Sequence, residues 1–113
     1  MHELSIAMGI VKIAEEEARK AGASTVEVIE LEIGTLAGIE LESLEFVWPV
    51  AVRETVLEKA EKRVQVIQGR ARCMDCDTEY EMEHFYDPCP HCSSNLKAIL
   101  QGKELRVRAL EVV

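Results

Sequence analysis

The chain has 113 residues, with 21 acidic and 13 basic side chains, four cysteines and a net charge of −8. This length fits one compact domain, or one small domain with a minidomain. The acidic balance argues against a general DNA or RNA binder, whose affinity comes mainly from Lys and Arg on phosphates. A hydrophobic content of 48% with 30% charged residues is typical of a globular protein and not of a disordered one.

The sequence has no apolar run of the ~18 residues that a membrane-spanning helix needs. Its start, residues 1–4, lacks the basic region and the long apolar stretch of a secretory signal. We therefore expect a cytoplasmic protein without a membrane partner. In that compartment four cysteines are more often metal ligands or redox groups than structural disulfides.

The first element in chain order is an amphipathic helix over residues 4–20. Apolar residues recur there at spacings of three and four, with most charged residues on the other side. Arg19 and Lys20 suit the last turn, where cations interact favourably with the helix dipole. Gly22 is then a plausible residue just past the C-terminus of the helix.

The next two elements are a strand over residues 24–33 and a second helix over residues 40–52, joined by a turn region at 34–38. The apolar alternation of the strand slips between Val28 and Ile29, so either a bulge lies there or both faces are partly covered. In the second helix Pro49 removes one hydrogen bond and costs about 3 kcal/mol. Either a kink or a helix that restarts at Pro49 is consistent with this pattern.

The cysteines form two Cys-x-x-Cys pairs, Cys73 with Cys76 and Cys89 with Cys92. Each pair can wrap one tight turn, and two such turns brought together by a hairpin offer four thiolates to a tetrahedral Zn²⁺. Iron also accepts four sulfur ligands. A redox pair is the other alternative, but the thioredoxin-like βαβ setting is missing. We predict a structural zinc site that supplies the folding energy of its segment.

Two histidines lie close to the cysteines in sequence. We expect His84 and His91 to be solvated or to lie outside the ligand sphere. Zinc geometry also permits a histidine in place of a cysteine, and His91 is adjacent to Cys92, so this alternative stays open.

Strands are also predicted at residues 63–68, 96–100 and 104–113. The cysteine segment has little core to receive the apolar residues of the last strand, so we expect this strand to return to the first sheet. The predicted fold is α+β, with two helices on an approximately three-stranded sheet and an inserted zinc-ribbon-like module. The expected domains are residues 1–69 with 103–113, which hold the helices and the sheet, and residues 70–102, which hold zinc.

The first three residues, Met1, His2 and Glu3, also permit metal binding. The α-amine of Met1, the amide nitrogen of His2 and the imidazole of His2 are linked by short chelate rings. Such a set suits a square-planar ion, Ni²⁺ or Cu²⁺. The first backbone N–H groups of a helix lack an internal partner, which leaves them available to a metal. By itself this feature is weak, because a histidine at the second position is usually solvated.

The chain resembles the HypA family of nickel metallochaperones, which serve maturation of [NiFe]-hydrogenase and, in some bacteria, urease. The resemblance spans essentially the whole chain. It is carried by Met1-His2-Glu3-Leu4-Ser5, Glu32-Ile33-Gly34, Leu41-Glu42-Ser43-Leu44-Glu45-Phe46, the two cysteine pairs and the closing Gly102-Lys103-Glu104-Leu105-Arg106-Val107. Pro49 departs from the family, which usually has a residue there that continues the helix.

This resemblance implies Ni²⁺ held by N-terminal nitrogens, with His2 essential and Glu3 contributing its backbone nitrogen and a nearby carboxylate. An acidic residue before the second helix also approaches nickel in part of the family, and Glu40 matches it. The alternative for Glu40 is an acid that interacts with the helix dipole. The implied mechanism is transfer of nickel by ligand exchange. The implied partners are a HypB-type GTPase, the [NiFe]-hydrogenase large subunit and, where present, urease maturation proteins.

Other classes of function fit the sequence less well. A zinc-ribbon adaptor that recruits a protein partner explains the cysteines but leaves the N-terminal triplet as coincidence. Residues 70–113 contain six basic and eight acidic side chains, so a nucleic-acid-binding face is not evident. We expect no enzyme, because we find no nucleophile–base pair and no His-Glu-x-x-His motif. Four thiolates would also leave no open position for an activated water.

Overall fold

The computed structural model describes residues 2–113. Contacts within the chain divide it into two compact units. The helical unit comprises the chain up to Leu31, Ile39–Gln65 and Arg106–Val113, and the cysteine unit comprises Glu32–Gly38 and Val66–Leu105. Neither of the helices among residues 2–113 combines the length with the apolar character that spanning a bilayer requires.

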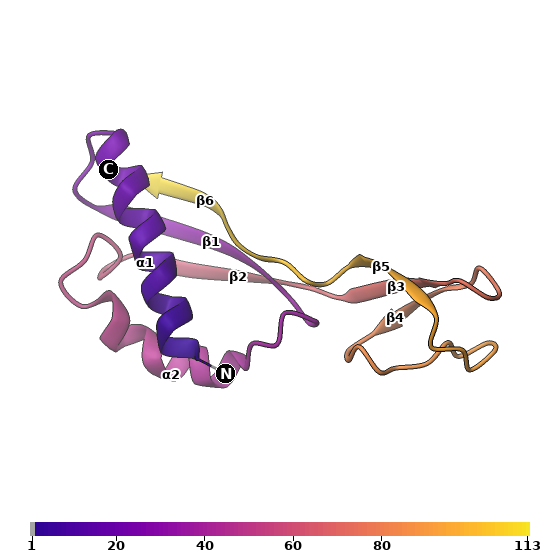
Figure 1. Cartoon of the computed structure of the whole chain (residues 1–113). Coiled ribbons are helices and arrows are strands. Elements are labelled where there is room, and N and C mark those ends of the chain that lie inside the picture. Colours follow the sequence, from indigo (N-terminus) through magenta and orange to yellow (C-terminus); the bar gives the residue numbers. More distant parts are fainter. Residues whose placement is uncertain (1) are drawn as a thin grey trace. The chain divides into compact units, whose positions relative to one another are not determined.

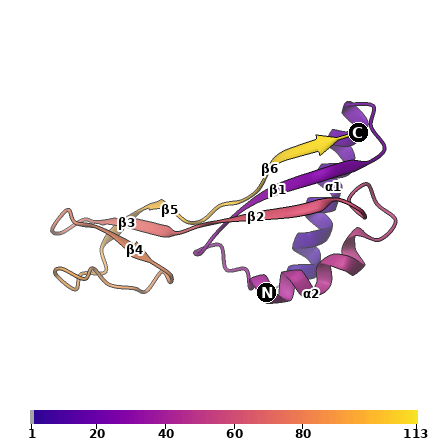
Figure 2. The same cartoon turned by 180° about the vertical axis from the view of Figure 1, so that it is seen from behind.

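The helical unit contains α1 (Glu3–Lys20) and α2 (Leu41–Val52), which pack against each other, and a sheet in the order β2-β1-β6. Its strands are β1 (Val26–Gly34), β2 (Glu61–Ile67) and β6 (Leu105–Val112). Figures 1 and 2 show both helices on one face of this sheet. Since β6 pairs beside β1, the prediction that the last strand returns to the first sheet is confirmed.

The buried face of α1 is made mainly of small residues. Ala7, Ala14 and Ala18 are fully buried, with Ile10 between them, and their size allows close packing of the helix. Leu4 belongs to the expected apolar stripe but is substantially exposed. The helix ends as predicted, with Gly22 at φ 68° beyond its last turn.

The central strand β1 is buried along most of its length, including both Val28 and Ile29. Coverage of both faces therefore accounts for the slip in its apolar alternation. In α2, Pro49 lies inside one continuous helix, so the restart alternative is wrong. Pro49 and Glu45, whose carbonyl loses its helical donor, are both exposed. Water can therefore bond the freed carbonyl, which reduces the cost of the proline.

The cysteine unit has a second sheet in the order β4-β3-β5, formed by β3 (Gly69–Cys73), β4 (Glu79–Met82) and β5 (Lys97–Gln101). Both neighbours are antiparallel to β3. No strand was expected at 69–73, yet β3 is the central strand. Its inward residues include Gly69 and Ala71, which have low β propensity and give a weak sequence signal.

The end of β1 and the segment that joins it to α2 pack within the cysteine unit. The backbone N–H of Gly34 donates to the carbonyl of Glu104 at 2.8 Å, and that of Leu36 donates to the carbonyl of Gly102 at 2.8 Å. A Cβ at Gly34 would lie 1.8 Å from the Gly102 oxygen, so the close approach requires glycine.

Two helices on a three-stranded sheet, with an inserted four-cysteine module, form the α+β fold that was expected. The expected domain boundaries, residues 1–69 with 103–113 and residues 70–102, stay a prediction about which segments fold independently.

Candidate metal centre

The two Cys-x-x-Cys pairs adopt matching turns. In the first, the backbone N–H of Asp77 donates to the carbonyl of Cys73 at 2.9 Å, and Asp77 has φ 67°. In the second, the N–H of Ser93 donates to the carbonyl of Cys89 at 2.8 Å, and Ser93 has φ 65°. A left-handed residue directly after each second cysteine thus reverses the chain around the sulfurs.

These turns bring the four sulfur atoms together, all within 4.8 Å of one another. The sulfurs of Cys73 and Cys92 are 3.5 Å apart, and those of Cys76 and Cys89 are 3.6 Å apart. A zinc–sulfur distance near 2.3 Å gives a tetrahedron with edges of about 3.8 Å. Disulfides would need sulfurs ~2.05 Å apart, and all four cysteines are free thiols. The donor set and its spacing therefore fit a tetrahedral zinc ion.

Hydrogen bonds tie the two turns to each other. The Ser94 hydroxyl donates to the carboxylate of Asp75, which lies between the first two cysteines. The N–H of Met74 donates to the carbonyl of Leu96 at 2.9 Å. In the second turn the N–H of His91 donates to the sulfur of Cys89 at 3.4 Å, a contact that favours a negatively charged sulfur. The surrounding backbone thus holds the sulfurs near one point.

The thiols differ in acidity within the cluster. Hydrogen bonding between Cys76 and Thr78, through the Thr78 side chain foremost and then its backbone, lowers the pKa of Cys76 to about 6. At Cys92 the Ser94 backbone acts to lower the pKa, but the nearby thiols, Cys73 foremost, and loss of hydration outweigh it and raise the pKa to about 12. Adjacent thiolates repel one another, so full ionisation of the cluster requires a bound cation such as Zn²⁺.

Cys73 and Cys89 are also part of an apolar core, together with Leu36, Ala71, Tyr80 and Met82. Leu36 is 5% exposed and comes from the segment that precedes α2 in the chain. Sequence reasoning missed this contact, because the expected module began at residue 70 and residues 34–38 were expected to be a turn. A lone leucine among Thr35, Ala37 and Gly38 was the only available signal.

The side chains of His84 and His91 lie outside the sulfur cluster and are exposed. His84 stacks on Tyr86 and lies 3.7 Å from the carboxylate of Asp87, measured from Nδ1. In the arrangement described for residues 2–113, the four cysteines are the one group of three or more His, Cys, Asp or Glu ligand atoms at metal-binding distances.

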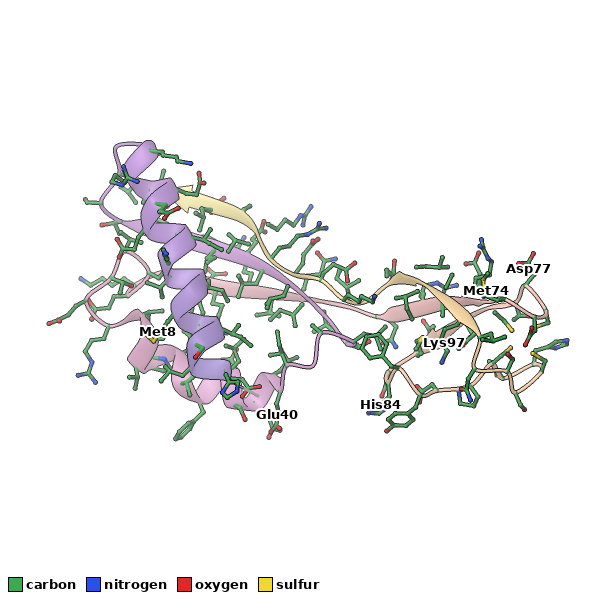
Figure 3. All side chains as sticks on the ribbon, in the orientation of Figure 1. Met8, Glu40, Met74, Asp77, His84 and Lys97 are labelled. Carbon is green, nitrogen blue, oxygen red and sulfur yellow. The ribbon has the colours of Figure 1, made fainter. Side chains whose placement is uncertain are left out.

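The N-terminal end of α1 meets the start of α2. His2 is exposed at the N-cap position of α1, and its carbonyl accepts a hydrogen bond from Ile6 at 3.0 Å. Glu3 is 7% exposed, and its carboxylate accepts a hydrogen bond from the backbone N–H of Glu40 at 3.2 Å. Glu40 itself is exposed at the N-cap of α2 (Figure 3). Met1 lies outside the described residues.

The structure thus brings Glu3 and Glu40 together through one hydrogen bond. It does not gather the side chains of His2, Glu3 and Glu40 into a metal-sized cluster. That absence does not bear on a site built mainly from backbone nitrogens. Sequence reasoning also missed the bond between Glu3 and Glu40, which joins residues 37 positions apart.

Comparisons of this chain with a family model and with relatives of known function all identify the same family. A family model described as "Hydrogenase/urease nickel incorporation, metallochaperone, hypA" matches residues 1–112. Hydrogenase maturation factor HypA of Parabacteroides distasonis is 49% identical over 112 residues, which cover 99% of this chain and 97% of that protein. Hydrogenase maturation factor HypA of Azotobacter vinelandii is 43% identical, with 99% of both chains covered.

A solved structure agrees with this assignment over the whole chain. The solution structure of the Ni metallochaperone HypA from Helicobacter pylori superposes with a TM-score of 0.70 and 25% identity, covering 100% of this chain and 98% of the other. Metallochaperones carry a metal and do not catalyse a reaction. The chain belongs to the HypA family of hydrogenase maturation metallochaperones.

Proposed function

We propose that this protein binds Ni²⁺ as cargo at its N-terminus and delivers it during [NiFe]-hydrogenase maturation, while a separate zinc ion stabilises the cysteine unit. The proposed nickel ligands are the amine of Met1, the amide nitrogen and imidazole of His2, and the backbone nitrogen of Glu3. The observation that carries this proposal is the exposed His2 at the N-cap of the first helix, in a chain of the HypA family.

The geometry of α1 supports the proposed ligand set. The helix begins at Glu3, so the amides of its first turn have no acceptor within the helix. The hydrogen bond from Ile6 to the His2 carbonyl fixes the backbone at this point. The exposed imidazole can therefore close a chelate ring with the preceding amide nitrogen. A planar nitrogen set at the surface leaves both axial faces open to an incoming ligand, which suits transfer.

Glu40 is proposed as an auxiliary nickel-approaching carboxylate. Its side chain is exposed, and its backbone is held beside α1 by the Glu3 carboxylate. The helix-dipole interaction expected for an acid at this position is compatible with that role. One oxygen of the Glu3 carboxylate accepts the hydrogen bond from Glu40, so we propose that this nearby carboxylate positions the start of α2 beside the N-terminal nitrogens.

Zinc is proposed as the resident ion of Cys73, Cys76, Cys89 and Cys92. Four sulfurs fill a tetrahedral coordination sphere and leave no open position for substrate or water. What the ion supplies there is folding energy, because the unit around it has few large buried side chains.

The maturation machinery provides the proposed partners. They are a HypB-type GTPase and the [NiFe]-hydrogenase large subunit, with urease maturation proteins as further recipients. We place the protein in the cytoplasm, where four free thiols can remain reduced for metal binding.

A nickel titration tests the proposal. The zinc-bound wild-type protein is titrated with Ni²⁺ beside His2→Ala, with His84→Ala as the matched control because His84 is an exposed histidine far away in sequence. We expect His2→Ala to lose one equivalent of nickel and His84→Ala to keep it. Equal nickel binding by all three proteins would reject the N-terminal site and favour a zinc-ribbon adaptor without a nickel role.

A further inference from the structure

A groove of about 640 Å³ lies between the start of α1 and the first two turns of α2 in the helical unit. We call it the α1–α2 groove. Among its described lining residues are His2, Leu4, Glu40, Glu42 and Phe46.

The apolar wall of the groove is exposed without any role in the core. Phe46 is 84% exposed, although α2 buries Leu44 and Trp48 on its other side. Two residues along a helix correspond to a rotation of about 200°, which places Phe46 opposite this buried face. Leu4 of the groove is also exposed on α1. Exposed large apolar side chains beside a groove are typical of a docking surface.

The acidic lining of the groove favours an occupant with positive charge. Glu40 and Glu42 line the groove and are exposed, and its described lining includes no Lys or Arg. The next acidic residue on α2, Glu45, is already paired with Lys62. An occupant with apolar side chains flanked by Lys or Arg would therefore be complementary to the groove, whereas a second copy would bring carboxylates against carboxylates. Anionic membranes and nucleic acids are disfavoured for the same reason.

We propose that the α1–α2 groove is the docking site for a basic, amphipathic segment of a partner protein. An apolar side chain of this segment packs on Phe46, and its Lys or Arg side chains pair with Glu40 and Glu42. His2 lines the same groove, so a docked partner reaches the N-terminal metal ligands directly. That last consequence rests on the proposed function, whereas docking itself does not.

The test uses a synthetic helical peptide with leucines at spacings of three and four and lysines elsewhere, labelled with fluorescein. Its affinity for the zinc-bound, full-length protein is measured by fluorescence anisotropy. We expect Phe46→Ser to weaken binding about tenfold, which corresponds to ~1.4 kcal/mol. The control is Tyr86→Ser, which removes an aromatic side chain that is 74% exposed in the cysteine unit. We expect this control to leave the affinity unchanged.

A second pair of variants tests the charge contribution. Glu42→Gln should weaken binding about threefold, and Glu16→Gln, an exposed acid of α1 outside the groove, should have no effect. A peptide with glutamate in place of lysine should not bind. Equal losses in Phe46→Ser and Tyr86→Ser, or equal binding of both peptides, would overturn the proposal.

Two further measurements separate the alternatives. If sedimentation showed a dimer that Phe46→Ser dissociates, the occupant would be a second copy and the proposal would be wrong. Nickel titration of Phe46→Ser should still give the wild-type stoichiometry, because Phe46 is not among the proposed nickel ligands. Nickel failing to bind the wild-type protein would reject the proposed function but leave the peptide result, and hence the docking site, intact.

Discussion

The cysteine unit and the N-terminal end of the helical unit offer metals two different environments. In the cysteine unit, four side chains converge within 4.8 Å, and two of them, Cys73 and Cys89, are buried in an apolar core. At the N-terminal end, His2 is exposed, and the other proposed ligands are backbone nitrogens, with the exposed Glu40 carboxylate as an auxiliary group. Enclosed side-chain ligands favour retention of an ion, whereas exposed backbone ligands at a helix start favour exchange. This contrast supports the proposed division between a resident zinc ion and a nickel cargo.

The supporting contacts differ in the same way. The cysteine turns are held by matched hydrogen bonds to the Cys73 and Cys89 carbonyls and by the contact between Ser94 and Asp75. Among the described residues, the start of α1 is held by the hydrogen bond from Ile6 to the His2 carbonyl and by the one from Glu40 to the Glu3 carboxylate. A rigid ligand set with many supporting bonds suits a structural metal, and a sparsely held one suits a site that must release its ion.

The largest effect is expected from removing a buried residue of the proposed zinc site. Cys89→Ala should abolish zinc binding and unfold β3, β4 and β5, because structural zinc contributes on the order of 10 kcal/mol of folding free energy. Zinc binding is measured as the zinc content of the purified protein, and folding of the three strands is measured from their amide chemical shifts. Met74→Ala, an exposed residue between two cysteines, should retain full zinc. A folded, zinc-loaded Cys89→Ala protein would contradict the proposed structural role of zinc in the cysteine unit.

A smaller loss should follow from Leu36→Ala. This side chain fills the apolar core beside Cys73 and Cys89, and truncating a buried leucine costs about 3 kcal/mol. Denaturant unfolding of the zinc-bound protein measures the free energy of unfolding. Leu96→Ala, which truncates an exposed leucine of the same unit, should cost far less. Similar losses in both variants would contradict the anchoring role of Leu36.

The N-terminal site should respond to an added residue that leaves the zinc site unchanged. One glycine placed before Met1 moves the free amine out of the proposed chelate. We expect nickel affinity to fall about a hundredfold, or ~2.7 kcal/mol, with zinc content unaffected. Calorimetry measures the affinity, and a protein with one glycine added after Val113 is the control. Unchanged nickel affinity in the N-terminally extended protein would exclude the amine as a ligand.

The smallest effect is expected at the loop that follows β4. The backbone N–H groups of Glu83 and His84 donate to the Asp87 carboxylate at 2.9 and 3.2 Å. The bond from Glu83 is the largest cause of the lowered pKa of Asp87. Because the pKa of Asp87 is lowered in the folded protein, its ionised carboxylate stabilises the folded state fully above the pKa of an unfolded aspartate, near 3.9. This stabilisation disappears as the pH falls through the lower pKa of the folded protein.

At neutral pH the Asp87 carboxylate is ionised and its stabilisation is complete. Under these conditions Asp87→Ala should increase the rate of amide hydrogen exchange at Glu83 and His84 a few-fold. Asp87→Asn retains an acceptor oxygen and should preserve most of the protection. Exchange that is unchanged in Asp87→Ala would show that Lys97, which donates to the carbonyls of Phe85 and Asp87 at 2.7 and 2.6 Å, holds this loop without the carboxylate (Figure 3).

Local sequence patterns predicted those helices and turns that are specified by residues only a few positions apart. The first helix was expected at 4–20 and is observed at Glu3–Lys20, because apolar spacing and terminal residues act over single turns. The clustering of the cysteines follows from their own spacing, since each pair can form its turn locally. β3 was missed because Gly69 and Ala71 carry little strand preference, and pairing on both sides, not propensity, makes this segment a strand.

By itself the sequence determined the two helices, the return of the last strand, the four-sulfur cluster and the family. Only the tertiary structure decided the burial of Leu36 beside the cysteines, the bond from Glu40 to Glu3 and the exposure of Phe46 in the α1–α2 groove. Periodicity and motif spacing report interactions between near neighbours in the chain. These three features depend on segments distant in sequence, and which ones meet is decided by the free energy of packing the whole unit.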